Sequence, residues 1–264
     1  ASYPLNTYLC LSCGHVQNLD IVDPEILFRN YTYRTSVSLG LVEHFKQYAA
    51  EAMTLLKLSP GALVVELGSN DGSLLSAFKA YGAEVLGVDP AREIAAIATA
   101  AGIQTLPEFF SKAIAEKIHR EKGKAALICA NNVFAHADNI TDIVQGIRQL
   151  LTEDGVFIFE VSYILDMIDH LVFDTIYHEH VSHHALVPLE KFFNTLDMTL
   201  FEVKRVNSKG GSIRGFAQIA STGKRPQSAQ LLAMMAEEKR RKLFNVKIYQ
   251  EFFLSIEQCK QLIL

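Results

Sequence analysis

The stretch from Tyr177 to His184 holds the densest group of reactive side chains in the chain. Its sequence is Tyr-His-Glu-His-Val-Ser-His-His, so four of the nine histidines stand beside a carboxylate and a phenol. Histidine ionises near neutral pH, and a neighbouring carboxylate can fix its tautomer and tune its basicity. Two hypotheses follow from these residues: a histidine metal site, or one histidine that acts as a general base.

The spacing of His178, His180 and His183 permits a metal site, because His-x-His and His-x-x-His pairs can chelate a transition metal. Only Glu179 adds a nearby carboxylate, which favours the general base over the metal. His183 and His184 are then expected to be structural or surface residues.

The composition indicates a soluble globular protein. The chain has 264 residues, a net charge of -4, 49% hydrophobic and 20% charged residues, and four cysteines. No apolar run approaches the roughly 20 residues that cross a bilayer, and the first residues lack a secretory signal. No basic stripe is present to bind nucleic acid, and sparse cysteines fit a reducing compartment. We therefore predict a cytoplasmic protein that acts on a small molecule, without membrane or nucleic-acid partners; the oligomeric state stays open.

Apolar strands alternate with amphipathic helices through the middle of the chain. This alternation predicts right-handed βαβ units and an α/β fold with a doubly wound, mostly parallel sheet. Two later β-like runs, 200–205 and 212–220, flank the turn 207–211 and predict an antiparallel hairpin at the sheet edge. The preceding elements are predicted as helix 36–58, strand 63–67, helix 74–81, strand 84–88, helix 91–101, strand 103–106, helix 111–121, strand 125–130, helix 140–151 and strand 156–161.

Polar residues follow several of the predicted strands and indicate a nucleotide-type ligand site. Glycines Gly68 and Gly72 frame the turn after the first strand, where glycine lets the backbone approach a ligand. Asp89 ends the second strand, about 20 residues later, where a carboxylate can bind both ribose hydroxyls. Asn131 and Asn132 close the fourth strand at the same edge.

The details of the first turn discriminate between two adenosine cofactors. A dinucleotide site requires G-x-G-x-x-G beside a pyrophosphate, and here Asn70 replaces the middle glycine. Glu66 would repel phosphate and suits an ammonium or sulfonium group. The pattern E-x-G-x-N-x-G resembles motif I of class I S-adenosylmethionine (SAM) methyltransferases. An NAD-dependent sugar oxidoreductase or epimerase, which would share the sheet and the role of Asp89, is the alternative.

Several stretches together resemble the sugar C-methyltransferases, SAM-dependent enzymes that methylate carbon 3 of nucleotide-linked 4-keto deoxysugars. They follow one another in order along nearly the whole chain. The most specific combination is Tyr-His-Glu-His after a SAM domain, followed by Gly-Gly-Ser-x-Arg. The matching pieces are Cys10-x-x-Cys13-Gly-His-Val-Gln, Phe28-x-x-Tyr31-x-Tyr33-x-x-Ser36-x-Ser38, Glu66 to Gly72, Asn132-Val-Phe-Ala-His136, Tyr177-His-Glu-His180 and Gly210-Gly-Ser-Ile-Arg214.

The resemblance implies a class I SAM-methyltransferase (Rossmann-like) fold and base-assisted C-methylation, in which an enolate attacks the SAM methyl group. It makes His180 the base, with Tyr177 and Glu179 orienting it or the substrate, and His136 holding the 4-keto oxygen. A SAM-dependent O-methyltransferase and a non-catalytic SAM-binding module are the alternatives. In an extended strand, alternation would separate His180 from Tyr177 and Glu179, so these roles require a turn.

The resemblance also suggests substrate contacts outside the catalytic group. Tyr31 or Tyr33 would complete the pocket wall, and His178 would stand beside the substrate. Arg214 would either bind a phosphate of the sugar nucleotide or form a surface salt bridge.

Members of this family carry an N-terminal zinc site of four cysteines, whereas this segment offers only Cys10 and Cys13. A structural zinc needs four ligands, so either the other pair precedes Ala1 in a longer chain, which we expect, or this version has lost the metal. The family also has a further C-terminal α/β domain. The predicted parts are a small N-terminal segment over 1–35, a SAM-dependent methyltransferase domain over 36–222 and a C-terminal helical tail over 223–264 that begins that further domain.

Overall fold

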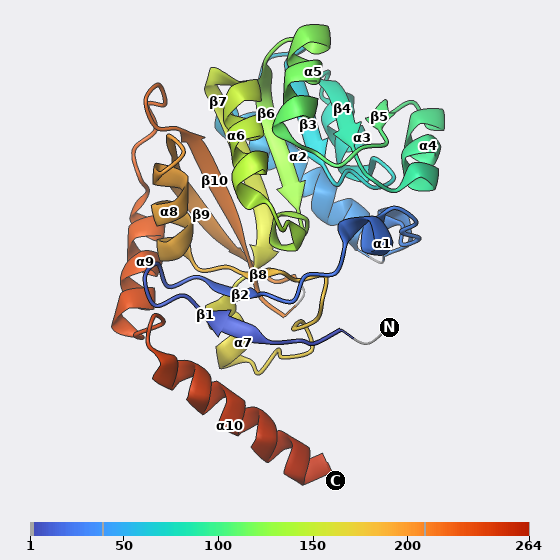
Figure 1. Cartoon of the computed structure of the whole chain (residues 1–264). Helices are drawn as coiled ribbons and strands as arrows, with labels where there is room; N and C mark the ends of the chain where they lie inside the picture. The colour runs from blue at the N-terminus through green and yellow to red at the C-terminus, as the bar shows by residue number, and fades with distance from the viewer. Residues whose placement is uncertain (1–2, 39, 209, 264) are drawn as a thin grey trace.

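A computed structural model describes residues 3–38, 40–208 and 210–263. Its centre is a seven-stranded sheet with the order β5-β4-β3-β6-β7-β10-β9 (Figure 1). Neighbouring strands from β5 to β7 run parallel. These are β3 (Leu63–Leu67), β4 (Glu84–Val88), β5 (Thr105–Leu106), β6 (Ala125–Asn131) and β7 (Leu151–Ser162). The predicted segments also include Ala1, Ser2, Leu39, Lys209 and Leu264, which lie outside the described residues.

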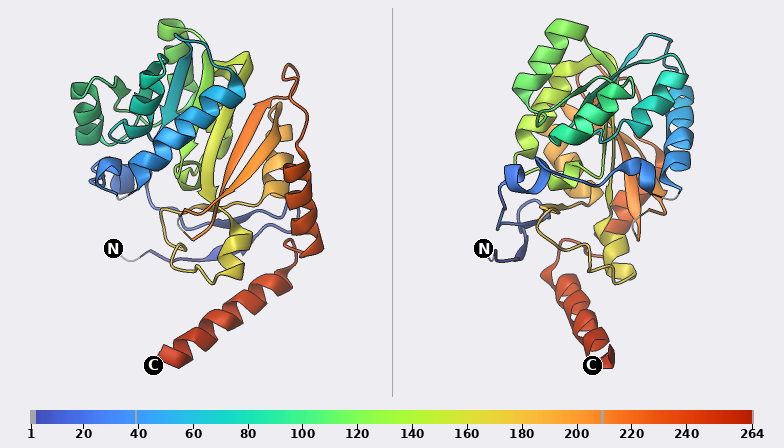
Figure 2. Two further views of the ribbon diagram at one scale, coloured as in Figure 1. Left: turned by 180° about the vertical axis from the view of Figure 1, so that it is seen from behind. Right: turned by 90° about the vertical axis from the view of Figure 1, so that its right-hand side faces the viewer.

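Helices cover both faces of this sheet, because its central strands are apolar throughout and bury both of their sides. In β3, Val64 packs in the core that contains Tyr48 and Phe78, whereas Val65 packs in the core that contains Ile118 and Ile147. The right-hand view of Figure 2 shows the two helical layers. One layer holds α2 (Leu41–Leu56), α3 (Ser73–Ala80) and α4 (Arg92–Ala100), and the other holds α5 (Lys112–Lys122) and α6 (Ile140–Leu150).

The predicted edge hairpin is present. Strands β9 (Met198–Val206) and β10 (Ser212–Ile219) are antiparallel, and β10 also pairs antiparallel with β7. Arg214 of β10 therefore stands opposite Glu160 of β7. The expected doubly wound, mostly parallel sheet with an antiparallel edge hairpin is confirmed. Helices α8 (Leu186–Asn194) and α9 (Ala229–Arg240) add residues to the core on the side of α5 and α6.

A second, three-stranded sheet lies at one end of the large one. It contains β1 (Thr7–Leu9), β2 (Val16–Asn18) and β8 (Ser182–His183), in that order. The first two belong to the N-terminal segment, and β8 belongs to the histidine-rich stretch (Figure 1). The small N-terminal segment predicted over 1–35 thus shares a sheet with the predicted methyltransferase domain. Strands of two or three residues are too short to show a periodic pattern.

The remaining differences concern the ends of elements. The predicted helix over 36–58 begins later, at Leu41, because Gly40 has a φ of 80°, outside the helical region. It is preceded by the short helices α1 (Pro24–Phe28) and η1 (Thr35–Val37), and α7 (Ile164–Asp169) follows β7. The last helix, α10 (Val246–Ile263), extends away from the body (Figure 1). No helix of the described segments has both the length and the apolar character needed to cross a membrane.

Candidate active site

A cavity of about 450 Å³ lies at the carboxyl ends of β3, β4 and β6. Of the residues expected to bind SAM, all but Gly72 line it. Four residues predicted for catalysis or substrate binding do not line it: Glu179, His180, His178 and Arg214. The predicted site residues in the wall are Glu66, Gly68, Asn70, Asp89, Asn131, Asn132, Tyr31, Tyr33, His136 and Tyr177.

The glycines of the first turn are required by the turn itself. Gly68 has a φ of 64°, and a Cβ there would overlap Cγ2 of Val133. Gly72 has a φ of 76° and is the residue before α3, where a Cβ would press on Ile103. Both positions therefore exclude side chains for reasons of backbone conformation and packing.

Glu66 is a buried carboxyl group that lacks a cationic partner. It is 3% exposed, and its Oε2 has no hydrogen-bond partner among the described residues. Burial raises its pKa well above the ordinary value; the side-chain amide of Asn131 opposes the rise, and the nearby carboxylates Asp89 and Asp71 add to it. A ligand cation in the cavity would relieve this cost by pairing with the ionised form.

The whole cavity wall has the same charge bias. None of its described lining residues is a lysine or arginine. Such a wall favours a ligand with an ammonium or sulfonium group and disfavours a pyrophosphate. The carboxylates in the wall are Asp23, Glu25, Glu66, Asp89, Asp138 and Asp142, of which Glu25 is ion-paired with Arg29.

Asn70 joins the cofactor-type turn to the N-terminal segment. Its backbone N donates to Oδ2 of Asp89 at 2.8 Å. Its side-chain Oδ1 accepts from the backbone N of Thr35, and its Nδ2 donates to the carbonyl oxygen of Tyr33, both at 2.8 Å. Tyr33 is thereby tied to the turn, and both Tyr31 and Tyr33 line the cavity wall, as the sequence predicted for at least one of them.

Four aromatic rings form a row beside the cavity. His136 lies in the short helix η2 (Phe134–His136) directly after β6. Its ring centroid is 5.6 Å from that of Phe28, with the planes 6° apart, and 5.0 Å from that of His180. The His180 ring is in turn 4.3 Å from the ring of Tyr177. The structure thus brings together three of the four predicted catalytic residues.

A turn places His180 against Tyr177, as these roles required. The backbone N of His180 donates to the carbonyl oxygen of Tyr177 at 3.0 Å. Nδ1 of His180 lies 2.6 Å from the carbonyl oxygen of Thr175, which can only accept, so Nδ1 carries the proton. In the neutral ring Nε2 is then an acceptor, and it lies 3.2 Å from the Tyr177 hydroxyl.

Tyr177 lines the cavity, and His180 does not. His180 is 8% exposed, and its ring contacts those of Tyr177 and His136, which both belong to the wall. Burial, followed by the charge of Glu179, raises the pKa of Tyr177 to about 12. The phenol therefore keeps its proton at neutral pH and donates it toward Nε2 of His180.

The other histidines of the stretch lie elsewhere. Nε2 of His178 approaches the carbonyl oxygens of Tyr3 and Pro4, at 3.3 and 3.0 Å, away from the cavity. His183 and His184 are both buried in the interior. Burial lowers the pKa of His183 to about 4, so its ring is neutral. Neither residue lines the cavity, and the described chain shows no group of three side chains arranged to hold a metal.

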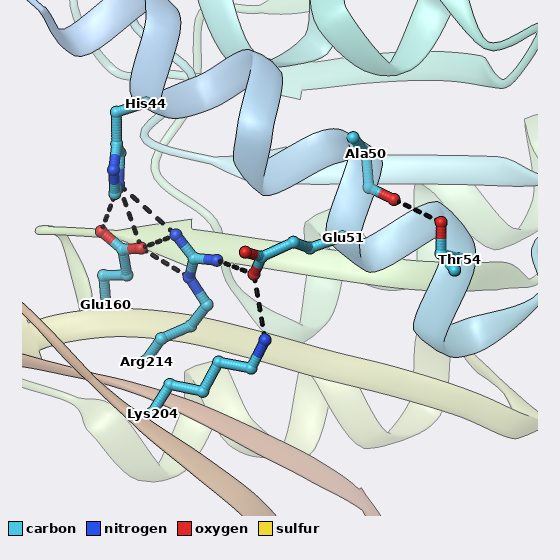
Figure 3. A network of polar contacts seen from close by, with 7 residues as sticks. All are labelled: His44, Ala50, Glu51, Thr54, Glu160, Lys204 and Arg214. Atoms are coloured by element: carbon cyan, nitrogen blue, oxygen red, sulfur yellow. Dashed lines mark hydrogen bonds and ion pairs between the residues drawn. The ribbon is translucent and has the colours of Figure 1, made fainter.

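Arg214 lies in a buried network instead of the cavity (Figure 3). Its Nε donates to Oε1 of Glu160 at 2.6 Å, and its Nη1 donates to Glu51 of α2 at 3.2 Å. Its guanidinium carbon lies 3.9 Å from the centre of the Tyr48 ring, and His44 approaches Glu160 at 3.2 Å. Of the two roles expected for Arg214, the structure shows the ion pair, buried where a surface pair was expected.

The described residues do not complete a zinc site at Cys10 and Cys13. Both cysteines are free and partly exposed, and no third His, Cys, Asp or Glu of the described chain joins them in a metal-binding arrangement. His15 is turned toward Ser182, with Nε2 at 3.1 Å from Oγ. A tetrahedral zinc requires four ligands, so these residues alone do not fit one.

Two residues near the site were missed from the sequence, Phe28 and Asn18. Phe28 stands three positions before Tyr31 in the family-like motif, and this spacing was its only signal. Asn18 carried no signal, because the carbonyl groups that its amide binds in the turn are more than 150 positions away in the chain.

The parallel sheet, the edge hairpin and a cavity at the strand ends define the class I SAM-dependent methyltransferase fold. Residues 41–203 match a family model described as a methyltransferase domain, and the chain belongs to this family. Residues 207–264 match the model described as a C-methyltransferase C-terminal domain. The chain is similar to the C-methyltransferase NovU of Streptomyces niveus, with 33% identity over 258 residues and 98% of this chain. It spans 61% of the length of NovU.

Solved structures resemble the fold at low sequence identity. The PH0226 protein of Pyrococcus horikoshii OT3 superposes with a TM-score of 0.56 and 14% identity, over 75% of this chain and 96% of its own. Magnesium protoporphyrin IX methyltransferase of Synechocystis PCC 6803, with bound SAH, superposes with a TM-score of 0.51 and 16% identity. The match covers 68% of this chain and 83% of that protein. The predicted methyltransferase fold and C-methyltransferase resemblance are therefore confirmed.

Proposed function

We propose that this protein is a SAM-dependent C-methyltransferase that acts on carbon 3 of a nucleotide-linked 4-keto deoxysugar, with His180 as the base. Its membership of the methyltransferase family and its similarity to NovU support C-methylation. The observation that carries the proposal is the Tyr177–His180 pair at 3.2 Å, whose phenol lies in the cavity wall.

The cavity fits a cationic methyl donor. When bound, SAM supplies the electrophilic methyl group that a substrate carbanion takes. Glu66 would hold a positively charged part of the donor, and its buried, unpaired Oε2 provides a position for that contact. Asp89, whose oxygens accept from the backbone N of Asn70 and Ala91, retains lone pairs for the ribose hydroxyls. The absence of basic residues from the described cavity wall argues against a dinucleotide.

The proton path follows from the tautomer of His180. A ketone acidifies the neighbouring C–H bond, so a base of near-neutral pKa can form the enolate. Because Tyr177 and not His180 faces the cavity, its hydroxyl takes the substrate proton as it passes its own to Nε2. Thr175 stabilises the imidazolium that results by accepting from Nδ1. His136, which lines the cavity and stacks on His180, stands where it can donate to the developing enolate oxygen.

The test is methyl transfer from SAM labelled with carbon-13 in its methyl group to a panel of TDP-, UDP- and GDP-linked 4-keto-6-deoxyhexoses. NMR of the product distinguishes a new carbon–carbon bond at position 3 from an O-methyl group. His180→Ala is expected to lower kcat at least about 100-fold. SAM binding, measured by calorimetry, should stay within a few-fold of wild type.

His119→Ala, on the exposed surface of α5, is the matched control and should keep wild-type kcat. Retention of methyl transfer by His180→Ala would overturn the base assignment. O-methylated product would overturn the C-methylation. Tight binding of NAD without binding of SAM would overturn the cofactor.

A further inference from the structure

A buried asparagine of the N-terminal segment holds the turn that carries Tyr177 and His180. Asn18 of β2 is 1% exposed. Its Nδ2 donates to the carbonyl oxygen of His180 at 2.9 Å and approaches that of Tyr177 at 3.4 Å. Its backbone N donates to the carbonyl oxygen of Val181 at 2.8 Å. One residue thus binds three carbonyl groups within the stretch 177–181.

The Asn18 side chain is itself fixed in orientation. Its Oδ1 accepts a hydrogen bond from the Thr7 hydroxyl at 2.7 Å, and Thr7 stands opposite Asn18 where β1 pairs with β2. Carbonyl oxygens can only accept hydrogen bonds, so the amide atom that faces them must be the NH₂ group, and the atom that faces the Thr7 hydroxyl must be the oxygen. Both donors of the amide therefore point at the turn.

The turn depends on such contacts because it lies outside regular structure. It follows α7 and precedes the two-residue strand β8, so no long ladder of backbone hydrogen bonds fixes it. The ring of His180 is tied to the carbonyl of Thr175, and the backbone of the turn is tied to Asn18. Displacing a reacting group by about 1 Å can lower a rate by about 100-fold. The Asn18 amide, which binds the carbonyl groups of the turn, would therefore determine whether Nε2 of His180 and the Tyr177 hydroxyl lie within hydrogen-bond distance.

We infer that Asn18 is a positioning residue for the Tyr177–His180 pair, an inference that rests on the base proposed for this site. Asn18 does not line the cavity, and it acts only through the backbone of the turn. On this account Asn18 makes β2 a support of the catalytic turn, although the two lie more than 150 positions apart in the chain.

The first experiment compares Asn18→Ala with Asn6→Ala in the full chain. Asn6 lies in the same segment, and its exposed amide donates only to Asp20 among the described residues. Asn18→Ala is expected to lower kcat about 10- to 100-fold, with the KM for SAM within about threefold of wild type. Thr7→Val, which frees the Asn18 amide to rotate, should lower kcat by about two- to fivefold. Asn6→Ala should equal wild type. The methyl acceptor in these assays is the nucleotide-linked 4-keto-6-deoxyhexose that the wild-type protein methylates fastest.

The second experiment separates positioning from general loss of folding. In a His180→Ala background, Asn18→Ala should cause no further loss of residual kcat, because residues that act as a unit are not additive. Proton–nitrogen correlation NMR of the histidine rings, which needs no acceptor, should show His180 as the Nδ1–H tautomer in wild type. In Asn18→Ala it should show a mixture.

The outcomes discriminate between the two proposals. If His180→Ala abolishes transfer while Asn18→Ala changes neither kcat nor the His180 tautomer, the positioning role is overturned and the base remains. An additive loss in the double variant, or a fall in the fraction of chains that bind SAM equal to the fall in kcat, also overturns it. If His180→Ala retains transfer, the base itself fails.

Discussion

Glu66 and Glu160 are buried to the same degree in one sheet, and their surroundings are opposite. Glu66 in β3 is 3% exposed and Glu160 in β7 is 1% exposed. Burial raises the pKa of Glu66 well above its ordinary range. Burial acts on Glu160 in the same direction, but the hydrogen bond from His44 and the charge of Arg214 outweigh it and hold the pKa of Glu160 below its ordinary value.

The difference separates a carboxylate that is paired within the protein from one that we propose pairs with a bound cation. The partners of Glu160 come from α2 and β10, so its charge ties a helix and the edge hairpin to the central sheet (Figure 3). Glu66 faces a cavity and has no cation within the described chain to pair with. A buried charge is tolerated in a protein when it is paired, and Glu66 obtains that pairing only from a bound cation.

The largest effect is expected at the paired carboxylate. Glu160→Gln leaves Arg214 buried without a full counter-charge, which should lower the free energy of unfolding by about 3 to 5 kcal/mol. Urea unfolding followed by circular dichroism measures this change. Glu43→Gln, on the exposed surface of α2, should change it by less than about 0.5 kcal/mol. A loss below about 1 kcal/mol at Glu160 would show that the network of Figure 3 contributes little to stability.

A smaller effect, on a different property, is expected at the unpaired carboxylate. Glu66→Gln removes the counter-charge for the ligand cation, so the Kd for SAM should rise roughly 10-fold, about 1.4 kcal/mol. The free energy of unfolding should not fall, because no ion pair within the described chain is broken. Calorimetric titration with SAM measures the Kd. The control variant is Glu84→Gln, which changes an exposed residue of the neighbouring strand. Unchanged affinity together with reduced stability would reverse the roles given to the two glutamates.

The smallest expected effect is a difference in pH dependence. A carboxyl group with a raised folded pKa contributes stability that is present at low pH and is lost as pH rises, which applies to Glu66. A lowered folded pKa contributes stability that is present above the ordinary value and is lost as pH falls, which applies to Glu160.

Removing either charge should therefore weaken the pH dependence of the free energy of unfolding, at higher pH for Glu66 and at lower pH for Glu160. Glu66→Gln should reduce the loss of stability as pH rises above about 4.5, and Glu160→Gln should reduce the loss as pH falls below about 4.5. Each slope is limited to about 1.4 kcal/mol per pH unit, the value for one proton. Thermal unfolding across pH measures both. The same flattening on one side by both variants would contradict the contrast.

The parts of this molecule that the sequence predicted correctly are encoded locally. The strand from Leu63 to Leu67 is apolar except for Glu66. The turn that follows has glycines at two positions where the backbone φ is positive, Gly68 and Gly72. Five parallel strands and the edge hairpin were therefore predictable from runs of apolar residues and the turns between them. The row from His136 to Tyr177 was reached through a family resemblance, because periodicity alone placed Tyr177 and His180 on opposite faces.

The parts that the sequence did not predict depend on pairings between distant residues. The position of Arg214 opposite Glu160 follows from the register of β10 on β7, which no local pattern specifies. Asn18 and the sheet it belongs to depend on contacts with the stretch after α7, and strands of three residues carry no periodicity. Long-range register is the information that a single sequence expresses most weakly.

The small sheet also has a consequence for the order in which the chain folds. Its pairing of Val16 with His183 closes a loop that contains the whole parallel sheet, and contacts so distant in sequence form late. The chain can thus complete the core of the parallel sheet before the turn at Tyr177, which contributes to one wall of the cavity, acquires its final geometry. On the proposed mechanism, fraying of β1 and β2 in the native protein would stop proton transfer while the parallel sheet stayed folded, so loss of chemistry would not require loss of folding.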